Sequence, residues 1–184
     1  MQGIDLLIEE HRHILRFTEL VRKRCCGLLE GEEVNCDEMR EFILFGRNYA
    51  DKHHHGKEEK VLFSVMREHL GPVAQHLVQN GMLVEHDLGR LHVGEWEKAV
   101  NQYEEHPSTN EKLNIIVNAV GYANLLGRHI DKEDNAVYTS AERFLSDELK
   151  EYVEQKTVEF ERAAKDQGVQ EKYLAWLDNK LKED

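Results

Sequence analysis

Proline, cysteine and aromatic residues are all scarce in this chain of 184 residues, which has 2 Pro, 3 Cys and 8% aromatic residues. Pro72 and Pro107 each lie in a short polar or glycine-containing stretch between long segments of helix-forming residues, so proline separates helices rather than interrupting them. Cysteine is odd in number, Cys25 and Cys26 are adjacent, and there is no C-x-x-C spacing, which is unlike a secreted disulfide framework or a cysteine metal site. We therefore expect reduced thiols.

Basic residues are in the minority, and no hydrophobic run is long enough to cross a membrane. The 24 Lys and Arg against 36 Asp and Glu give a formal net charge of −12, which disfavours binding to nucleic acid or to an anionic lipid surface. Residues 1–10 lack the basic and continuous apolar regions of a signal peptide, so we expect a cytoplasmic protein. With 40% hydrophobic residues, the chain can bury the core of one ordinary domain.

Apolar residues recur at helical spacing in four long segments, which predicts an all-α protein. We expect these helices at about 4–29, 37–70, 73–105 and 109–145, and residues 108–111 form a capping-box pattern at the start of the fourth. Short loops favour antiparallel neighbours, so residues 1–145 are predicted to form an up-down-up-down four-helix bundle. Residues 146–184 are predicted to add a C-terminal helical extension packed on the bundle.

The four predicted helices contain an internal repeat. When residues 4–66 are compared with the chain 75 positions later, polar residues match without a gap. His11 and His54 are 43 positions apart, and so are His86 and His129. Helix packing explains a repeated apolar pattern, but it does not require histidine and glutamate at equivalent places. The matched polar residues are Glu10 and His11 with Glu85 and His86, His54 with His129, and Lys57, Glu58 and Glu59 with Lys132, Glu133 and Asp134.

Six of the repeated residues lie on the apolar faces of their helices, and a His-x-x-x-Glu spacing twice puts an imidazole and a carboxylate one turn apart. Burying four imidazoles and two carboxylates without partners is costly, and metal ions are the simplest partners. Six donors are too many for a four-coordinate zinc ion but suit two ions that share the carboxylates as bridges, about 3.5–4 Å apart. The predicted ligands are His11, His54, Glu58, His86, His129 and Glu133.

Over about residues 4–145, runs of this sequence resemble the hemerythrin-like, or HHE cation-binding, family. The runs are 10–11, 49–63, 85–90 and 129–134. The resemblance implies a four-helix bundle around two non-haem iron ions joined by an oxo or hydroxo bridge, with the four histidines as terminal ligands and Glu58 and Glu133 as bridges. Two positions depart from the oxygen-carrying hemerythrins. Arg90 replaces their second histidine on the third helix, and their bridging aspartate falls at Asp134, although Glu133 fits the His-x-x-x-Glu pattern better.

The resemblance also implies a function, which is to bind or sense dioxygen, nitric oxide or peroxide at an open iron position, with an electron donor that the sequence does not identify. Four histidines in place of five leave at least one more coordination position, which makes a plain oxygen carrier the less favoured interpretation. The alternatives are a di-iron enzyme, either a peroxidase or a nitric oxide reductase, and an iron-donating repair factor for iron–sulfur centres. A phosphoryl-accepting histidine module is disfavoured, because this chain is predicted to bury its histidines beside carboxylates.

The register of the second helix leaves one alternative open. His53 and His55 are expected on other faces of the helix than His54, but a rotated helix would bring His55 inward instead, with Glu59 as its carboxylate.

Two tyrosines precede the histidines of the second and fourth helices by one to two turns. Tyr49 and Tyr122 are interpreted as core aromatics, although a phenol beside an open iron position could donate a hydrogen bond or act as a ligand. Gly89 lies in the middle of a predicted helix, where glycine costs about 1 kcal/mol relative to alanine, so we expect a close helix approach there.

Overall fold

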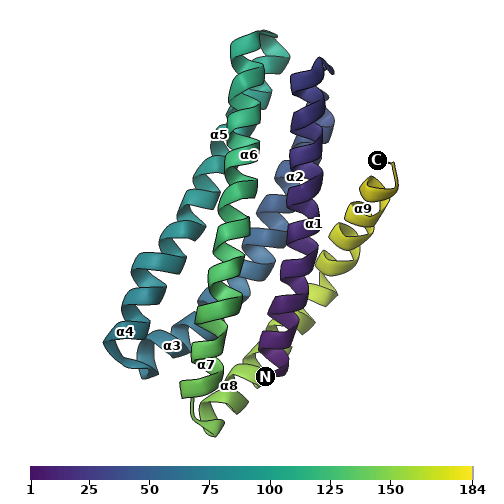
Figure 1. Ribbon diagram of the computed structural model, residues 1–184. Coiled ribbons are helices and arrows are strands. Elements are labelled where there is room, and N and C mark those ends of the chain that lie inside the picture. The colour runs from purple at the N-terminus through teal and green to yellow at the C-terminus, as the bar shows by residue number, and fades with distance from the viewer. Residues whose placement is uncertain (184) are drawn as a thin grey trace.

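The computed structural model describes residues 1–183, and every regular element within them is a helix. Four long helical segments lie side by side in an up-down-up-down bundle (Figure 1). The first is α1 (Gln2–Glu30), and each of the other three contains π-helical turns, designated η. The second consists of α2 (Cys36–Phe45), η1 (Gly46–His55), η2 (Glu58–Leu62) and α3 (Phe63–His69). The third consists of α4 (Gly71–Leu77), η3 (Val78–Met82) and α5 (Leu83–Glu105), and the fourth of α6 (Thr109–Lys132), η4 (Glu133–Val137) and α7 (Tyr138–Phe144).

Local sequence signals determine where the helices begin and end. The first helix ends at Gly31, whose φ of 109° lies in the left-handed region that glycine adopts without strain. The side chain of Asn35 accepts a hydrogen bond from the backbone N–H of Glu38, and Ser108 caps α6 in the same way through Glu111. Ser108 is therefore the N-cap of α6, as the predicted capping-box pattern requires, and the short loops make consecutive helices antiparallel.

The buried interior is divided into two apolar clusters with a polar layer between them. Along α1, the smaller cluster includes Ile4 and Leu7, the larger cluster begins at Ile14, and His11 lies between. The other three long segments repeat this order. In the second segment the larger cluster ends at residue 50 and the smaller cluster begins at residue 61. In the third and fourth segments, the stretches between the two clusters are 82–93 and 130–137. All four gaps contain or adjoin buried histidines or glutamates, so the polar residues form one layer across the bundle.

Two further helices, α8 (Asp147–Asp166) and α9 (Val169–Glu183), follow the bundle and run along the side formed by α1 and the second segment (Figure 1). Leu177 is fully buried in the larger apolar cluster. The indole of Trp176 lies 5.7 Å from the ring of Phe42, and its N–H donates to Glu41 at 3.2 Å. The C-terminal helices therefore contribute side chains to the bundle core.

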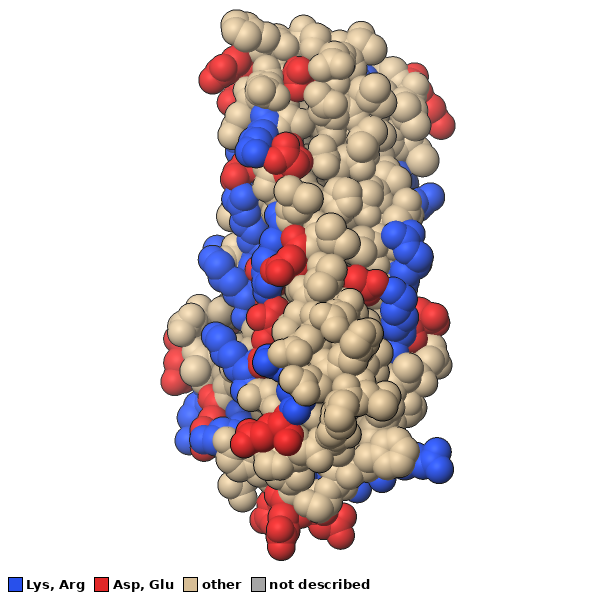
Figure 2. Space-filling model, turned by 90° about the vertical axis from the view of Figure 1, so that its left-hand side faces the viewer, with Lys and Arg blue, Asp and Glu red and all other residues tan. Residues whose placement is uncertain are grey.

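Among residues 1–183, no helix combines the length and the apolar character needed to cross a membrane. On the face shown in Figure 2, basic and acidic side chains stand next to one another in strips, separated by uncharged surface.

Candidate metal centre

The π-helical turns determine which side chains enter the polar layer. A π-helical turn bonds residue i to i+5, so each such turn accommodates one more residue than an α-helical turn. In η1 this places His53, His54 and His55 all in the interior, with 3%, 1% and 3% exposure. The expectation that His55 lies on another face than His54 is wrong, because both enter the polar layer. The same expectation agrees with the structure for His53, whose ring contacts Glu10 and Glu161 on the other side of His54. Glu58 and Glu133 begin η2 and η4, and both are fully buried.

The buried donors form two adjoining groups. Within each group, the potential ligand atoms lie within 4.8 Å of one another. The first group is His11, His54, Glu58 and Glu133, and the second is His55, Glu58, His86 and His129. The structure thus brings all six predicted residues together and adds His55 as a seventh donor. From the sequence, His55 is an alternative to His54, whereas the structure places both in the layer. We refer to these seven residues as the cage.

Both carboxylates of the cage reach both groups. The Oε2 atom of Glu133 lies 3.2 Å from Nε2 of His11, and its Oε1 atom lies 3.1 Å from Nε2 of His129. The Oε2 atom of Glu58 lies 3.8 Å from Nε2 of His54 and 3.5 Å from Nε2 of His86. Each glutamate therefore lies beside histidines of both groups.

Several cage atoms have no hydrogen-bond partner among the described residues, although they are fully buried. These atoms are Nε2 of His54, Oε2 of Glu58 and both carboxylate oxygens of Glu133. Leaving such groups unpaired in the interior costs about 1–3 kcal/mol each, and more when they are charged. Cations between the two groups would satisfy these atoms, and mixed imidazole and carboxylate donors are typical ligands of iron, manganese and zinc. The residues present therefore fit a pair of metal ions.

The carboxylates of the cage are electrostatically unlike. Burial, and then the neighbouring Glu133 carboxylate, raise the pKa of Glu58 well above its usual value. Burial also opposes the ionisation of Glu133, but the surrounding His129 and His11 outweigh it and hold the pKa of Glu133 well below its usual value. Two buried carboxylates this close repel each other when both are ionised, and this repulsion is what a bound cation would relieve.

Four cage histidines are oriented by carboxylates that lie outside the cage. Glu10 accepts from Nδ1 of His54 at 2.8 Å, and Glu85 accepts from Nδ1 of His129 at 2.9 Å. Because a carboxylate accepts and does not donate, each Nδ1 carries the proton and each Nε2 faces the cage. Asp134 and Glu59 hold the other two histidines in the same way, the distances being His11 Nδ1 to Asp134 2.7 Å and His86 Nδ1 to Glu59 2.7 Å.

These outer contacts follow the 75-residue repeat, so the repeat extends beyond the cage itself. They also separate the roles of the two acids on the fourth segment. Asp134 is occupied in orienting His11, whereas Glu133 lies between the two groups of donors. The preference for Glu133 over Asp134 as the bridging residue therefore has a geometric basis.

Two cage-side residues break the repeat. His55 corresponds to Ile130, so only the second donor group has a third imidazole; its ring stacks on that of His86 at 3.8 Å. Tyr138 corresponds to Phe63, and its hydroxyl donates to Oε1 of Glu58 at 2.5 Å. The same hydroxyl lies 3.3 Å from Nε2 of His11, in the first group. The repeat pairs Tyr138 with Phe63, but the role of the Tyr138 hydroxyl was not predicted from the sequence. The one indication in the sequence is that only one member of this aromatic pair carries a hydroxyl.

The other aromatic and arginine residues considered from the sequence lie outside the cage. Tyr122 packs against Gly46 and Gly89, where an added Cβ would come within 3.3 and 3.4 Å of its ring, so both glycines lie next to this side chain. Tyr49 is a buried core aromatic beside Phe45. Arg90, which stands where the oxygen carriers have a second histidine, pairs with Asp51, Glu59 and Asp87.

Comparison with protein-family models gives one match, to the hemerythrin HHE cation-binding domain, over residues 2–141. A search of curated proteins finds no similar protein. The matched range covers the first three bundle segments and the fourth as far as residue 141 in α7. It includes every residue of the cage and ends before α8. The bundle, the buried histidine and glutamate clusters and the family match agree, and the chain belongs to the hemerythrin HHE cation-binding domain family.

Proposed function

We propose that the cage holds two iron ions and that a small oxidant, namely dioxygen, nitric oxide or peroxide, binds reversibly at one of them. The observation that carries this proposal is the unequal distribution of histidines around two shared carboxylates. His11 and His54 would hold one ion, and His55, His86 and His129 the other, with Glu58 and Glu133 as bridges. The first ion would have one histidine fewer than the second, so we place the open position on its side.

The resident irons would supply the electrons that such oxidants accept on binding. The residues of this chain supply the surroundings. The two apolar clusters above and below the polar layer limit the access of water, and the outer carboxylates hold each imidazole in one orientation. With His55 in the cage, the chain offers five histidines rather than four. A missing histidine therefore no longer disfavours a plain oxygen carrier.

The proposal is tested by metal analysis and optical spectroscopy of aerobically purified protein. We expect two irons per chain and ferric absorption bands in the near-ultraviolet and visible. Anaerobic reduction should bleach these bands, and addition of dioxygen or nitric oxide should then produce new bands that saturate at one ligand per chain. Protein that carries zinc or no metal would contradict the proposal, and continuous consumption of the oxidant with an electron donor would indicate an enzyme instead.

Tyr138 provides a sharper prediction for the binding side. Its hydroxyl is on the two-histidine side of the cage, where its single proton, donated to Glu58 in this structure, would turn to an incoming oxidant instead. The variant Tyr138→Phe should fold and retain two irons, because Phe63 occupies the equivalent place in the other half of the repeat. Its ligand should dissociate about tenfold faster, since a hydrogen bond to a charged group contributes about 1.5–3 kcal/mol. Stopped-flow displacement of the bound ligand measures this rate.

Tyr122→Phe is the matched control for this measurement. Tyr122 is as deeply buried as Tyr138, and its ring packs on glycine backbone instead of on the cage. The control should keep the wild-type dissociation rate. Equal rates for both variants would show that the Tyr138 hydroxyl does not contact the ligand.

A further inference from the structure

A second cluster of buried charges lies behind His54, on the side away from the cage. Glu10 accepts from Nδ1 of His54 through one oxygen, and its other oxygen lies 2.8 Å from Nε2 of His53 and pairs with the ammonium of Lys57. Lys57 also pairs with Glu161 of α8, whose Oε1 atom lies 3.6 Å from Nε2 of His53. These four residues, Glu10, His53, Lys57 and Glu161, are called the outer cluster below. They link His54 to the C-terminal helices.

The other half of the repeat shows what the outer cluster adds. There, Glu85 accepts from His129 and pairs with Lys132, which matches Glu10, His54 and Lys57. The side chain of Lys132 is 49% exposed, however, whereas that of Lys57 is 1% exposed. The difference comes from α8, which covers Lys57 with Glu161 and with the ring of Phe160, 5.9 Å from the ammonium. An ammonium ion in the interior requires paired carboxylates, and Glu161 supplies the second.

The outer cluster is not a third metal site. Glu10, His53 and Glu161 do offer three potential donors within 4.8 Å of one another. The ammonium of Lys57 pairs with both carboxylates, and it therefore already supplies the cation between them. The carboxylate of Glu10 is held ionised by this arrangement. Burial opposes its ionisation, but hydrogen bonds from His53 and His54 and the charge of Lys57 keep the pKa of Glu10 well below its usual value.

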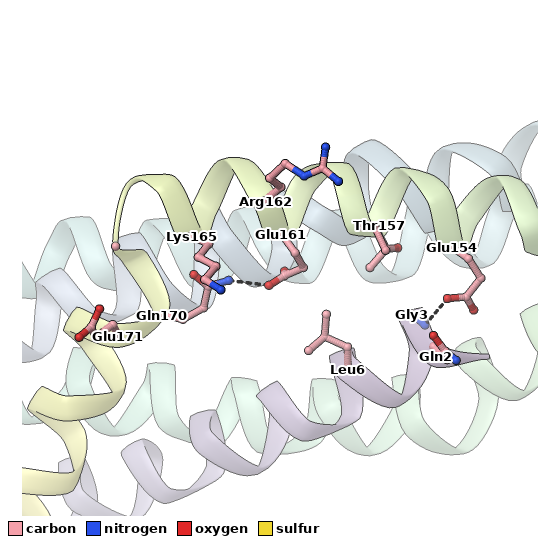
Figure 3. Close-up of a pocket in the computed structure, with 12 residues that line it drawn as sticks. Gln2, Gly3, Leu6, Glu154, Thr157, Glu161, Arg162, Lys165, Gln170 and Glu171 are labelled. Carbon is pink, nitrogen blue, oxygen red and sulfur yellow. Dashed lines mark hydrogen bonds between the residues drawn. The ribbon is translucent and has the colours of Figure 1, made fainter.

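Glu161 also connects the outer cluster to α9 and to the surface. Its Oε2 atom accepts from the side-chain amide of Gln170 at 2.5 Å. Figure 3 shows Glu161 on the wall of an open groove of about 780 Å³ between the start of α1 and α8, with Gln170 and Lys165 beside it. The side chain is 23% exposed, and glutamine has the same shape, so Glu161→Gln removes the charge without leaving a void.

We propose that Glu161 is a positioning residue for the two-histidine ion, and that α8 in this way completes the metal centre from outside the family domain. The inference rests on the proposed function, because it requires His54 to be a metal ligand. While Glu161 is ionised, the ammonium of Lys57 is shared between two carboxylates, and Glu10 remains a strong acceptor for His54 Nδ1. Without the charge of Glu161, Lys57 pairs with Glu10 alone. This weakens the hydrogen bond between Glu10 and His54 and adds net positive charge beside the ion.

Glu161→Gln tests this proposal in the full chain, with Glu154→Gln as the matched control. Glu154 lies on the same helix and also contacts α1, accepting from the backbone N–H of Gly3 at 2.8 Å, but it has no contact with Lys57. Iron release from the reduced protein to a ferrous chelator is followed in both variants. We expect Glu161→Gln to release one of its two irons, the two-histidine ion, about tenfold faster than wild type. Glu154→Gln should release iron at the wild-type rate.

A redox titration and a double variant separate positioning from a merely structural effect. The midpoint potential of Glu161→Gln should be higher than that of wild type, because a lost negative charge favours the reduced ions. In the Lys57→Met background, Glu161→Gln should cause no further acceleration of iron release. Equal release from the Glu161→Gln and Glu154→Gln variants, or an undiminished effect in the Lys57→Met background, would overturn the inference. Wild-type protein without iron would overturn the proposed function as well, so the two failures are distinguishable.

Discussion

Glu58→Gln is expected to abolish metal binding while leaving the metal-free protein folded and as stable as wild type. Without metal, burial and the neighbouring Glu133 carboxylate raise the pKa of Glu58 well above its usual value and so favour its neutral form, which glutamine resembles closely. The acceptor for Tyr138 is also preserved in the amide. To bridge two ions, however, Glu58 must be ionised, and an amide cannot replace it. We expect the iron content to fall from two to near zero per chain.

Thermal unfolding with and without metal measures both halves of this expectation. Wild-type protein should gain about 4 kcal/mol of stability when free metal exceeds the dissociation constant about 1,000-fold, and Glu58→Gln should gain none. Glu68→Gln is the matched control, because Glu68 lies on the same helical segment with its side chain 73% exposed. His69→Ala and His106→Ala should likewise keep both irons, since both histidines are exposed outside the cage. A Glu58→Gln protein with two irons would exclude Glu58 as a bridge.

The bundle itself was predictable because its signals are local. Both prolines lie close to turns between the long segments. The predicted end of the first helix near Gly31 and the predicted start of the fourth near Ser108 agree with the structure to within a few residues. The six repeated cage residues were predictable for a different reason. A repeat that preserves histidine and glutamate on apolar faces is not required by packing, so it indicates chemistry, and the structure brings those six residues into one layer.

His55 could not be placed from the sequence, because its position depends on helical geometry that the sequence pattern does not specify. Regular α-helical periodicity puts three consecutive histidines on different faces. The π-helical turns of η1 and η2 change that register and bring all three into the interior. The contact of α8 with Lys57 could not be predicted for a related reason. Lys57 and Lys132 are equivalent in the repeat, and only the packing of α8 makes one buried and the other half exposed.

His55→Ala should remove the ion of the three-histidine group and leave the other in place. His55 has the closest ring stacking of the cage histidines, 3.8 Å from His86, and its imidazole nitrogen lies within 4.8 Å of Glu58, His86 and His129. Losing one imidazole of three should weaken binding of that ion by at least about tenfold. Iron content should therefore drop from two toward one per chain under dilute conditions, and the ferric bands of a coupled pair should be replaced by those of a single ion.

His69→Ala is the control, because His69 lies on the same helical segment, outside the cage and the outer cluster, with its side chain 41% exposed. It should retain two irons. His54→Ala should lose the ion of the two-histidine group, so the variants at 54 and 55 should each leave a different single ion. If His55→Ala kept two irons and only His54→Ala lost one, the centre would be a four-histidine site, and the open position could no longer be assigned to the His11 side alone. The buried imidazole of His55 thus decides how many histidines surround each ion, and with it the side on which an oxidant binds. In a regular α-helix, this imidazole would lie on another face than that of His54.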